Sequence, residues 1–492
     1  MLEHRQADGG ILQPARTLPV ESEYDVVVVG GGIAGFGAGV AAARAGARTL
    51  VVEQLSMLGG LVTAGLVNKV LDFVGGIGAE MFKRLEEVDG LWHRNSDPEK
   101  HKLILDRMAR EAGCDLLFVT SVVDSIVSGD EIRGVVVENK TGRQAILAKR
   151  VVDCSGDADA AFHAGCEVMQ GRPGDGLSQA CSLEFRLGGV EWDAYAESDL
   201  KKTDSGWVRL IEQAKAEGDT VWKLENHLNW MTHIPGRPER RGMDEVSICL
   251  AHSRNCRPTD ARDLTRMYLE GREQVDELWR FIRKRVPGFA GSYLIDTGCL
   301  MGVRESRRVL GEYVMRGMDI ASCRKFDDVI AISHHGYDVH NPDGVGNIKW
   351  IEAEIDGKTC YVITHPGSGM SSTWDPPGGK DAYTDSKGRK GDAMRFPEKI
   401  AYDIPYRSLL PVKMDNLLVA GRCLSADFMA QSGCRLIMCC LSMGESAGTA
   451  AAMSLEKGVR PRDLDIMELQ RRLVANGMDI GQHMRDISGL GD

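Results

Sequence analysis

One segment near the start of the 492-residue chain constrains its fold most, residues 24–53. The apolar run Val26 to Val29 leads into Gly30-Gly-Gly-Ile-Ala-Gly35, and a second apolar run ends at Glu53. A pyrophosphate has to approach bare backbone and rest on a helix N-terminus, where unpaired N–H groups and the helix dipole favour an anion. The order of these residues therefore predicts strand, phosphate-binding turn, helix and strand, which together form a dinucleotide site.

Each glycine in this turn has a physical role. Gly30 makes the tight turn out of the strand, Gly32 leaves room for the pyrophosphate, and Gly35 lets the helix lie against the strand. Glu53 follows Gly35 by 18 residues, where its carboxylate can accept hydrogen bonds from ribose hydroxyls and would repel a 2′-phosphate. FAD or NAD therefore fits better than NADP. The alternative, a glycine-rich turn that binds nothing, is disfavoured by the complete spacing of strand, helix and acid.

Composition favours a large enzyme that acts on small metabolites. Sixty basic against 71 acidic side chains give a net charge of -11, so no nucleic-acid partner is expected. The 13 cysteines, an odd number without CxxC pairs, indicate reduced thiols in the cytoplasm. The first residues lack the pattern of a secretion signal, and the glycines of the uncharged run 26–43 fit the nucleotide fold, so no membrane segment is expected.

The residues after Glu53 favour FAD over NAD. A second glycine-rich turn, Gly59-Gly60 continuing to Thr63, would let backbone approach another part of the same cofactor, with an ordinary loop as the alternative. The pattern then predicts a strand at 116–119, a three-stranded meander over 121–149 and a returning strand at 151–154. Such a meander between Rossmann strands is typical of flavin proteins.

Two later segments repeat the pattern of an apolar strand followed by glycine and charge. Residues 150–160 end in Gly156, Asp157 and Asp159, and residues 416–427 contain Gly421-Arg422. Residues 442–452 follow as a helix with a face of small side chains. That face suits close helix packing, cofactor contact, or both.

With these segments the chain resembles the FAD-dependent oxidoreductases of the glutathione-reductase-like fold, specifically a bacterial family with a GGGxAG start and a late NLLVAGR segment. The resemblance implies an α/β protein with a Rossmann-like FAD-binding domain, which contains the β-meander, and an inserted mixed α+β substrate domain. It extends over residues 26–67, 150–165, 302–313, 402–411 and 416–452.

The resemblance also implies roles for single residues. Glu53 would bind the adenosine ribose, Val122 the adenine through its backbone, and Gly59-Gly60 the ribityl or flavin portion. Gly421, Arg422 and the turn Gly433 to Leu436 would close the isoalloxazine end, where a helix N-terminus or a cation stabilises the reduced ring; Arg435 is the candidate cation. The predicted cofactor-binding residues are Gly30, Gly32, Ala34, Gly35, Glu53, Gly59, Gly60, Thr63, Val122, Asp157, Gly421, Arg422, Gly433, Arg435 and Leu436.

The expected domain plan has four parts: an N-terminal arm at 1–20, the FAD-binding domain at 21–165 and again at 405–492, and a substrate or cap domain at 166–404. The middle of the chain has no second GxGxxG, so we expect the substrate itself to reduce FAD and a diffusing acceptor to reoxidise it. Hydrophobic periodicity predicts helices at 261–285 and 304–315 and strands at 245–250 and 329–332. The Gly/Pro-rich loop 366–397 is expected to be a lid or an interface arm.

The candidate catalytic residues lie in this middle region and just beyond it. Arg304 could hold a carboxylate or phosphate, although a solvated helix face with internal ion pairs is an equal alternative. His334, His335 and His340 share a loop that could supply a general base, or each could be structural. Their spacing matches no zinc motif, so no metal is expected. Tyr402 and Arg407 could line the cleft between the domains.

The leading hypothesis is an FAD-dependent dehydrogenase that takes a hydride from a small polar, possibly anionic, metabolite, working as a cytoplasmic homo-oligomer. The rival is a flavoprotein with a non-redox lyase, isomerase or RNA-modifying role. A nucleotide-binding scaffold without catalysis is the third possibility.

Overall fold

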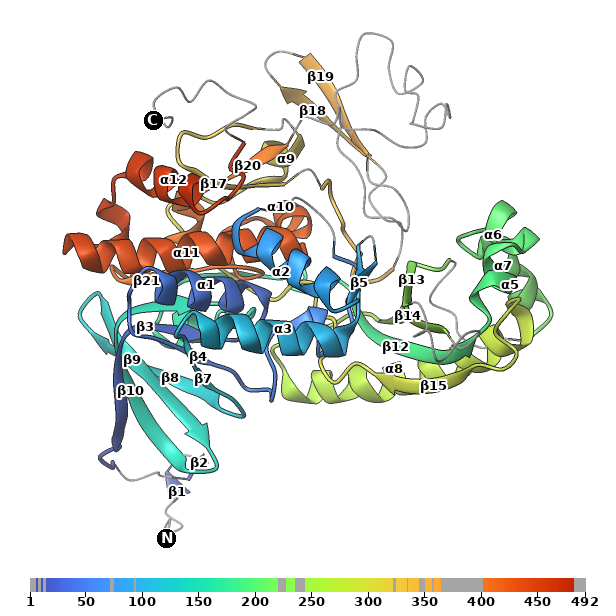
Figure 1. The fold of residues 1–492 in the computed structure, drawn as a ribbon, viewed down its shortest axis with the longest axis horizontal. Helices are drawn as coiled ribbons and strands as arrows, with labels where there is room; N and C mark the ends of the chain where they lie inside the picture. Colours follow the sequence, from blue (N-terminus) through green and yellow to red (C-terminus); the bar gives the residue numbers. More distant parts are fainter. Residues whose placement is uncertain are drawn as a thin grey trace.

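A seven-stranded sheet forms the centre of the protein (Figure 1). The computed structural model describes residues 6–7, 10–11, 15–70, 75–92, 94–219, 227–234, 244–321, 324–333, 335–344, 350–355, 358–363 and 401–481. The strands follow the order β7-β4-β3-β10-β9-β8, and β21 also pairs with β10. Their bounds are β3 (Val20–Val29), β4 (Thr49–Val52), β7 (Asp115–Leu117), β8 (Ser121–Ser128), β9 (Glu131–Asn139), β10 (Gly142–Asp153) and β21 (Leu417–Val419).

Strand β10 belongs to both the Rossmann layer and the meander. Along one edge it pairs parallel with β3. Along the other edge, residues 142–147 pair antiparallel with β9, and residues 151–153 pair parallel with β21. The sequence predicted two strands here, the last of the meander and a returning strand, and that division is wrong because one continuous strand changes partners along its length.

Helices α1 (Ile33–Arg44) and α11 (Ile437–Lys457) lie side by side across the sheet, next to α2 (Gly76–Glu87) and α3 (Pro98–Glu111) (Figure 1). Their contact is backbone to backbone. A Cβ added at Gly444 would lie 1.9 Å from the carbonyl oxygen of Ala34, and one at Gly448 2.1 Å from that of Ala38. The small-residue face at 442–452 therefore serves close helix packing, as one of the predicted alternatives held.

The cap domain has its own antiparallel sheet and its own core. Its strand order is β13-β14-β12-β15, and α8 packs against the sheet. The predicted helix at 261–285 is confirmed at both ends, and the side chain of Asp260 caps it by accepting from the N–H of Asp263. The bounds are β12 (Cys181–Val190), α5 (Trp192–Ala196), α6 (Asp199–Thr203), α7 (Val208–Ala216), β13 (Trp230–Ile234), β14 (Asp244–Ser253), α8 (Ala261–Arg285) and β15 (Tyr293–Thr297).

The two hydrophobic cores divide the chain differently from the predicted plan. The core of the cap domain takes its residues from 181–303. Buried residues of 315–339 and 401–404, placed in the substrate domain by the sequence, pack in the core of the FAD-binding domain. In Figure 1 the strands β17 (Val329–Ser333) and β20 (Tyr402–Pro405) accordingly lie beside α11. The predicted strand at 329–332 is confirmed.

The helix predicted at 304–315 is wrong. Only a short strand, β16 (Arg307–Val309), forms there, paired with β11 (Val168–Gln170). Glu305 and Arg308 are buried as an ion pair, and the Glu305 carboxylate also accepts from the N–H of Gly171 (2.9 Å). Glu305 and Arg308, two of the charges that suggested a solvated helix face, are therefore paired inside the protein instead.

The remaining elements lie at the periphery of the two domains or between them. The predicted N-terminal arm contains the paired strands β1 (Gln6–Ala7) and β2 (Gly10–Ile11), and the predicted loop 366–397 lies outside the described residues. Among those residues no single helix is long and apolar enough to span a membrane, although α10 and α11, bent by 92°, meet that criterion together. The other bounds are β5 (Leu91–Trp92), β6 (Asn95–Ser96), α4 (Asp159–His163), α9 (Gly317–Ala321), β18 (Trp350–Ile355), β19 (Lys358–Ile363), α10 (Phe428–Cys434) and α12 (Ile466–Ala475).

Candidate functional site

A cavity of about 630 Å³ is lined by residues of both domains. This volume is typical of cavities that hold a small molecule or part of a cofactor. We call the part formed by the FAD-binding domain the nucleotide end, which is lined by Gly30, Gly32, Ala34, Glu53, Gly59, Gly60 and Val122. We call the opposite part the cap end, which is lined by Ser182, Glu184, Asn229, Trp230, Tyr268 and Arg304, together with His335, Asp338, His340 and Arg435.

The glycine turn leaves open space at one position only. Gly30 has a φ of +91°, and a Cβ added there would lie 2.6 Å from the carbonyl oxygen of Cys154. A Cβ at Gly35 would lie 1.8 Å from the oxygen of Gly30, so Gly35 packs behind the turn and does not line the cavity. A Cβ at Gly32 would meet nothing within 4 Å. This opening lies at the N-terminus of α1. No side chain caps that helix, so its first N–H groups suit an anion.

Glu53 is held by backbone donors at the nucleotide end. Its Oε2 accepts from the N–H of Gly31 (2.6 Å) and its Oε1 from the N–H of Leu55 (2.7 Å). Burial raises the pKa of the Glu53 carboxyl, and these backbone N–H groups oppose that rise. Each carboxylate oxygen can accept a second hydrogen bond. The spare capacity suits the two hydroxyls of a ribose.

A backbone hydrogen bond connects the second glycine turn to the first. The N–H of Gly59 donates to the oxygen of Gly31 (2.8 Å), and both Gly59 and Gly60 line the cavity. Thr63, predicted to bind the cofactor, does not line the cavity. Its buried hydroxyl donates to the oxygen of Leu58 (2.6 Å), so Thr63 stabilises the turn from behind.

Four predicted residues from three distant segments line the cavity wall. Val122 lines it near the start of β8, where the pairing with β9 shifts register. Asp157 and Arg422 also line it and form an ion pair of 2.9 Å, and Arg422 donates to Ser306 (2.7 Å). Gly421 lies in the lining beside Arg422.

The residues between α10 and α11 line the cavity, whereas the nearby Gly433 does not. Gly433 is buried within α10, where an added Cβ would meet Ile320 and Tyr402, so its predicted cofactor contact is corrected to helix packing. Arg435 and Leu436 line the cavity. No side chain caps the N-terminus of α11, so this end offers a helix N-terminus that suits a reduced flavin, whereas the predicted cation, Arg435, is ion-paired with Asp338 (2.7 Å).

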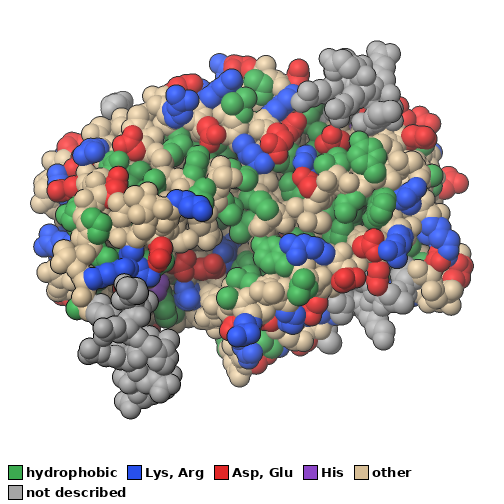
Figure 2. Space-filling model, turned by 90° about the horizontal axis from the view of Figure 1, so that it is seen from below, with side chains coloured by type: hydrophobic (Ala, Val, Ile, Leu, Met, Phe, Trp, Pro, Cys, Tyr) green, Lys and Arg blue, Asp and Glu red, His purple; other side chains and the backbone are tan. Residues whose placement is uncertain are grey.

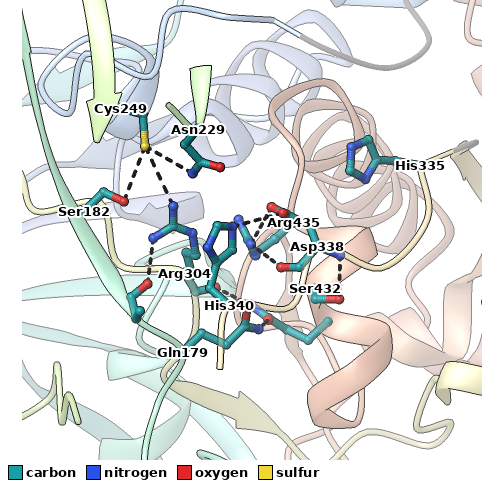
Figure 3. Close-up of polar contacts among 12 residues, drawn as sticks. Gln179, Ser182, Asn229, Cys249, Arg304, His335, Asp338, His340, Ser432 and Arg435 are labelled. Carbon is teal, nitrogen blue, oxygen red and sulfur yellow. Dashed lines mark hydrogen bonds and ion pairs between the residues drawn. The ribbon is translucent and has the colours of Figure 1, made fainter. Parts of the chain in front are cut away.

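Arg304 presents a cation at the cap end. It is buried, and its guanidinium, shown in Figure 3, donates to the oxygen of Ala180 (2.6 Å). Nε2 of His252 lies 3.2 Å from the same guanidinium. No carboxylate of the described residues forms an ion pair with it. The alternative of a solvated helix face is therefore wrong for Arg304.

Of the three predicted histidines, His340 joins the charged cluster. Its Nε2 lies 3.1 Å from Oδ1 of Asp338, and Oδ2 of Asp338 pairs with Arg435 (2.7 Å). Burial, with Arg304 adding to the effect, lowers the pKa of His340 to about 4, so its imidazole is neutral at neutral pH. His335 also lines the cavity, its Nδ1 lies 3.1 Å from the oxygen of Gly336, and its charge contributes to the lowered pKa of Asp338. His334 lies outside the described residues.

The predictions for Tyr402 and Arg407 are wrong, because neither residue lines the cavity. Tyr402 is fully buried in β20, where it pairs with Ser333 of β17. Arg407 forms an ion pair with Asp328 (2.9 Å) away from the cavity. Tyr402 belongs to the core of the FAD-binding domain and not to the wall of the cleft.

Sequence reasoning missed most of the cap end. Glu184 is buried among residues of an apolar strand, and burial raises the pKa of its carboxyl well above the usual range although Arg304 opposes this. Asn229 directly precedes β13 and His252 lies in the neighbouring strand β14, and the Asn229 amide lies 3.4 Å from Nε2 of His252. No spacing in the sequence links these positions. In the described part of the chain no group of three or more His, Cys, Asp or Glu side chains is arranged to hold a metal ion.

The fold and the cavity define a flavoprotein of the Rossmann-like class with a separate cap domain. The open position at Gly32, the uncapped helix α1 and the buried Glu53 carboxylate fit the pyrophosphate and ribose of FAD. The model of the FAD dependent oxidoreductase family matches residues 25–365 and 376–473, and the chain belongs to this family. The protein is thus an FAD-dependent oxidoreductase, and FAD is its cofactor.

Solved structures with a similar fold come from several kinds of flavoprotein. A geranylgeranyl bacteriochlorophyll reductase-like protein of Thermoplasma acidophilum has 14% identity and a TM-score of 0.41, over 94% of this chain and 85% of that one. A flavoprotein/dehydrogenase of Cytophaga hutchinsonii has 12% identity and a TM-score of 0.38, over 92% and 84%. The FAD-dependent halogenase CndH, from a myxobacterium, has 12% identity and a TM-score of 0.38, over 92% and 79%. Likenesses of this size do not bear on the substrate.

Proposed function

We propose that this FAD-dependent oxidoreductase is a dehydrogenase that takes a hydride from a small polar anion, and that a diffusing acceptor then reoxidises the flavin. Bound FAD supplies the hydride acceptor. The observation that carries the proposal is the Arg304 guanidinium, which lies in the cavity wall and has no carboxylate partner among the described residues.

The charges at the cap end favour a negatively charged ligand. Asp338 is matched by Arg435, and although burial alone would raise the pKa of Asp338, Arg435 and His340 hold it well below its usual range. Burial raises the pKa of the Glu184 carboxyl well above its usual range, which favours the neutral form of this group. The charge of Arg304 is therefore not compensated by a carboxylate of the described residues. A buried guanidinium without a counter-ion is stabilised by a ligand carboxylate or phosphate.

His252 positions the guanidinium for this role. Its Nδ1 lies 3.2 Å from the carbonyl oxygen of Leu250, which accepts from the Nδ1–H tautomer. Its Nε2 is then the lone-pair nitrogen and accepts from Arg304. A neutral His252 thus orients the cation without cancelling its charge.

His340 is the residue we assign to the proton that leaves with the hydride. It is neutral at neutral pH, and Asp338 accepts at its Nε2 and would stabilise the imidazolium. Arg304 contributes to the low pKa of His340. An anion bound to Arg304 offsets that positive charge, so His340 becomes a stronger base when the substrate is in place.

Anaerobic titration of the holoenzyme with a panel of small carboxylates and phosphate esters tests the proposal. We expect at least one compound to bleach the visible absorption of the flavin. Arg304→Ala should raise the concentration required by about 10²-fold, as expected for loss of a buried charge-assisted contact. Arg280→Ala, at an exposed arginine of α8 that does not line the cavity, is the matched control and should behave as the wild type.

If no compound of a broad panel reduces the flavin while the holoenzyme remains folded, the dehydrogenase proposal fails and the non-redox role gains. Its RNA-modifying form calls for a basic surface. On the face shown in Figure 2, Lys and Arg side chains alternate with Asp and Glu. That mixture gives no support to an extended nucleic-acid footprint on this face.

A further inference from the structure

We infer that the cap end selects a hydroxylated anion over an amino acid: Arg304 binds the anionic group, and the protonated carboxyl of Glu184 donates a hydrogen bond to an oxygen of the same molecule. This inference rests on the proposed function and names the substrate class for that site.

The placement of Glu184 is the first argument. Its side chain is buried, it lines the cavity, and its Oε2 has no hydrogen-bond partner among the described residues. Buried polar atoms are normally satisfied, so an unsatisfied one in a cavity wall indicates a group that a ligand completes. The backbone oxygen of Glu184 accepts from the N–H of Gly298 (2.8 Å), which fixes the residue in the sheet. Ser182 lines the cavity from the same face of β12.

The protonation state is the second argument. Burial raises the pKa of the Glu184 carboxyl and so favours its neutral form, and Arg304 is the cation that opposes this. The other titratable groups of this wall are the Cys249 thiol, which donates to Ser182, and His252, which accepts from Arg304. Two influences favour ionisation of Glu184, the charge of Arg304 and a hydrogen bond with the Cys249 side chain, and a substrate anion on Arg304 offsets the first and larger of them. The carboxyl then carries an O–H donor, which suits an alcohol or carbonyl oxygen.

An ammonium group is disfavoured at the same place. It has only donors, and it would lie near the uncompensated charge of Arg304. Asp338, an ionised carboxylate of the cap end, is already paired with Arg435 and His340. The site therefore distinguishes an alcohol from an amine by charge as well as by hydrogen bonding.

The wall beside Glu184 suits the carbon skeleton of the substrate. The Tyr268 hydroxyl makes its hydrogen bonds within the protein, because it donates to the oxygen of Cys299 (3.1 Å) and accepts from the N–H of Met301 (2.7 Å). Its ring, with Trp230 and Leu264, lines the cavity. The wall at Trp230, Leu264 and Tyr268 thus offers the ligand an apolar surface beside the polar groups of the cap end.

Binding of matched carboxylates to the holoenzyme tests the inference. The probes are three sets with one skeleton each: lactate, alanine and propionate; malate, aspartate and succinate; phenyllactate, phenylalanine and phenylpropionate, with both enantiomers where they exist. Calorimetry under anaerobic conditions measures affinity, and flavin bleaching is recorded separately. We expect the hydroxy acid of at least one set to bind at least about tenfold more tightly than its amino and deoxy partners.

Two variants isolate the carboxyl. Glu184→Gln keeps an N–H donor and should keep the preference for the hydroxy acid, whereas Glu184→Met removes the donor and should make the hydroxy and deoxy acids bind equally. Infrared difference spectra of ligand binding should show a protonated-carboxyl band in the wild type that is absent in Glu184→Gln. Glu197→Met, at an exposed carboxylate of the cap domain, is the control. Flavin content and melting temperature verify that each variant folds.

Tighter binding of the amino member, no binding by any set, or an unchanged preference in Glu184→Met would each overturn the inference. The two proposals fail separately. Bleaching by an amino acid would support the dehydrogenase proposal and contradict the selectivity for an alcohol. Selective binding of a hydroxy acid without bleaching by any compound would support the selectivity and contradict the dehydrogenase proposal.

Discussion

Glu445, inside α11, accepts a hydrogen bond of 2.9 Å from the backbone N–H of Ile77 in the first turn of α2. No side-chain hydrogen bond caps α2 at its own N-cap, Gly75, so a carboxylate from the other end of the chain performs that task. The contact holds α2 against the helix pair that encloses the nucleotide end.

This contact predicts that stability falls as the pH rises. Burial raises the pKa of Glu445 to about 7, whereas the unfolded chain has a value of about 4.3. The folded state therefore binds more protons between these values, so the stabilisation is complete below pH of about 4 and is lost as the pH approaches about 7. Glu445→Gln, which stays neutral, should be more stable than the wild type at pH 8 by on the order of 3 kcal/mol. Urea unfolding at pH 5 and pH 8 measures the difference, and equal pH dependence in both proteins would refute it.

Gly444→Ala should separate α1 from α11. The added methyl group would lie 1.9 Å from the oxygen of Ala34, a backbone atom that cannot move aside alone. We expect a loss of about 3 kcal/mol in the free energy of unfolding and reduced FAD content, since the first turns of both helices line the cavity. Gly206→Ala is the control, because its added Cβ would meet only Val208 at 3.8 Å. Similar stability in the two variants would contradict the packing argument.

Glu53→Gln should weaken FAD binding. The Gln side chain retains one acceptor oxygen, so its N–H₂ group would face either the N–H of Gly31 or that of Leu55. The loss of one hydrogen bond and the carboxylate charge predicts an affinity about 10- to 100-fold lower. Fluorescence titration of the apoprotein with FAD measures it. Glu138→Gln, at a solvent-exposed carboxylate of β9, should leave the affinity unchanged.

His340→Gln should slow flavin reduction by about 10²-fold or more while leaving FAD content unchanged. In the wild type, kcat/KM should fall with decreasing pH as free His340 takes up its proton near its pKa of about 4. For kcat the fall should begin at higher pH, because a bound anion offsets the Arg304 charge that lowers the pKa of His340. Stopped-flow measurement of flavin reduction across this pH range provides both profiles. If kcat and kcat/KM fall at the same pH, the coupling between Arg304 and His340 is refuted.

The cofactor could be predicted from the sequence because its recognition is local. The turn at Gly30 to Gly35 and the acid at Glu53 lie within one strand–helix–strand unit, whose spacing follows from backbone geometry. Helix α8 was predicted to the residue for the same reason, since its apolar period and its cap at Asp260 are adjacent. The glutathione-reductase-like subfamily, the cytoplasmic location and the homo-oligomer stay predictions.

The catalytic end of the site could not be predicted in this way. Arg304 and His340 were identified as single candidates, but Tyr402 and Arg407 were wrong, and Glu184 and His252 went unnoticed. The sequence does not show whether a charged residue lies in a buried cluster or on a solvated face. Only the folded contacts, such as the pairing of Asp338 with both His340 and Arg435, assign each charge its partner.

What the amino-acid sequence by itself determined is the class of protein and its cofactor, because both depend on short-range periodicity and on glycines within one supersecondary unit. What only the tertiary structure decided is which charge remains without a partner. Among the described residues, Arg422 and Arg435 are paired with carboxylates from distant segments, Asp157 and Asp338, whereas no carboxylate forms an ion pair with Arg304. Charge compensation is a property of distances in space, and the order of residues along a chain does not contain those distances.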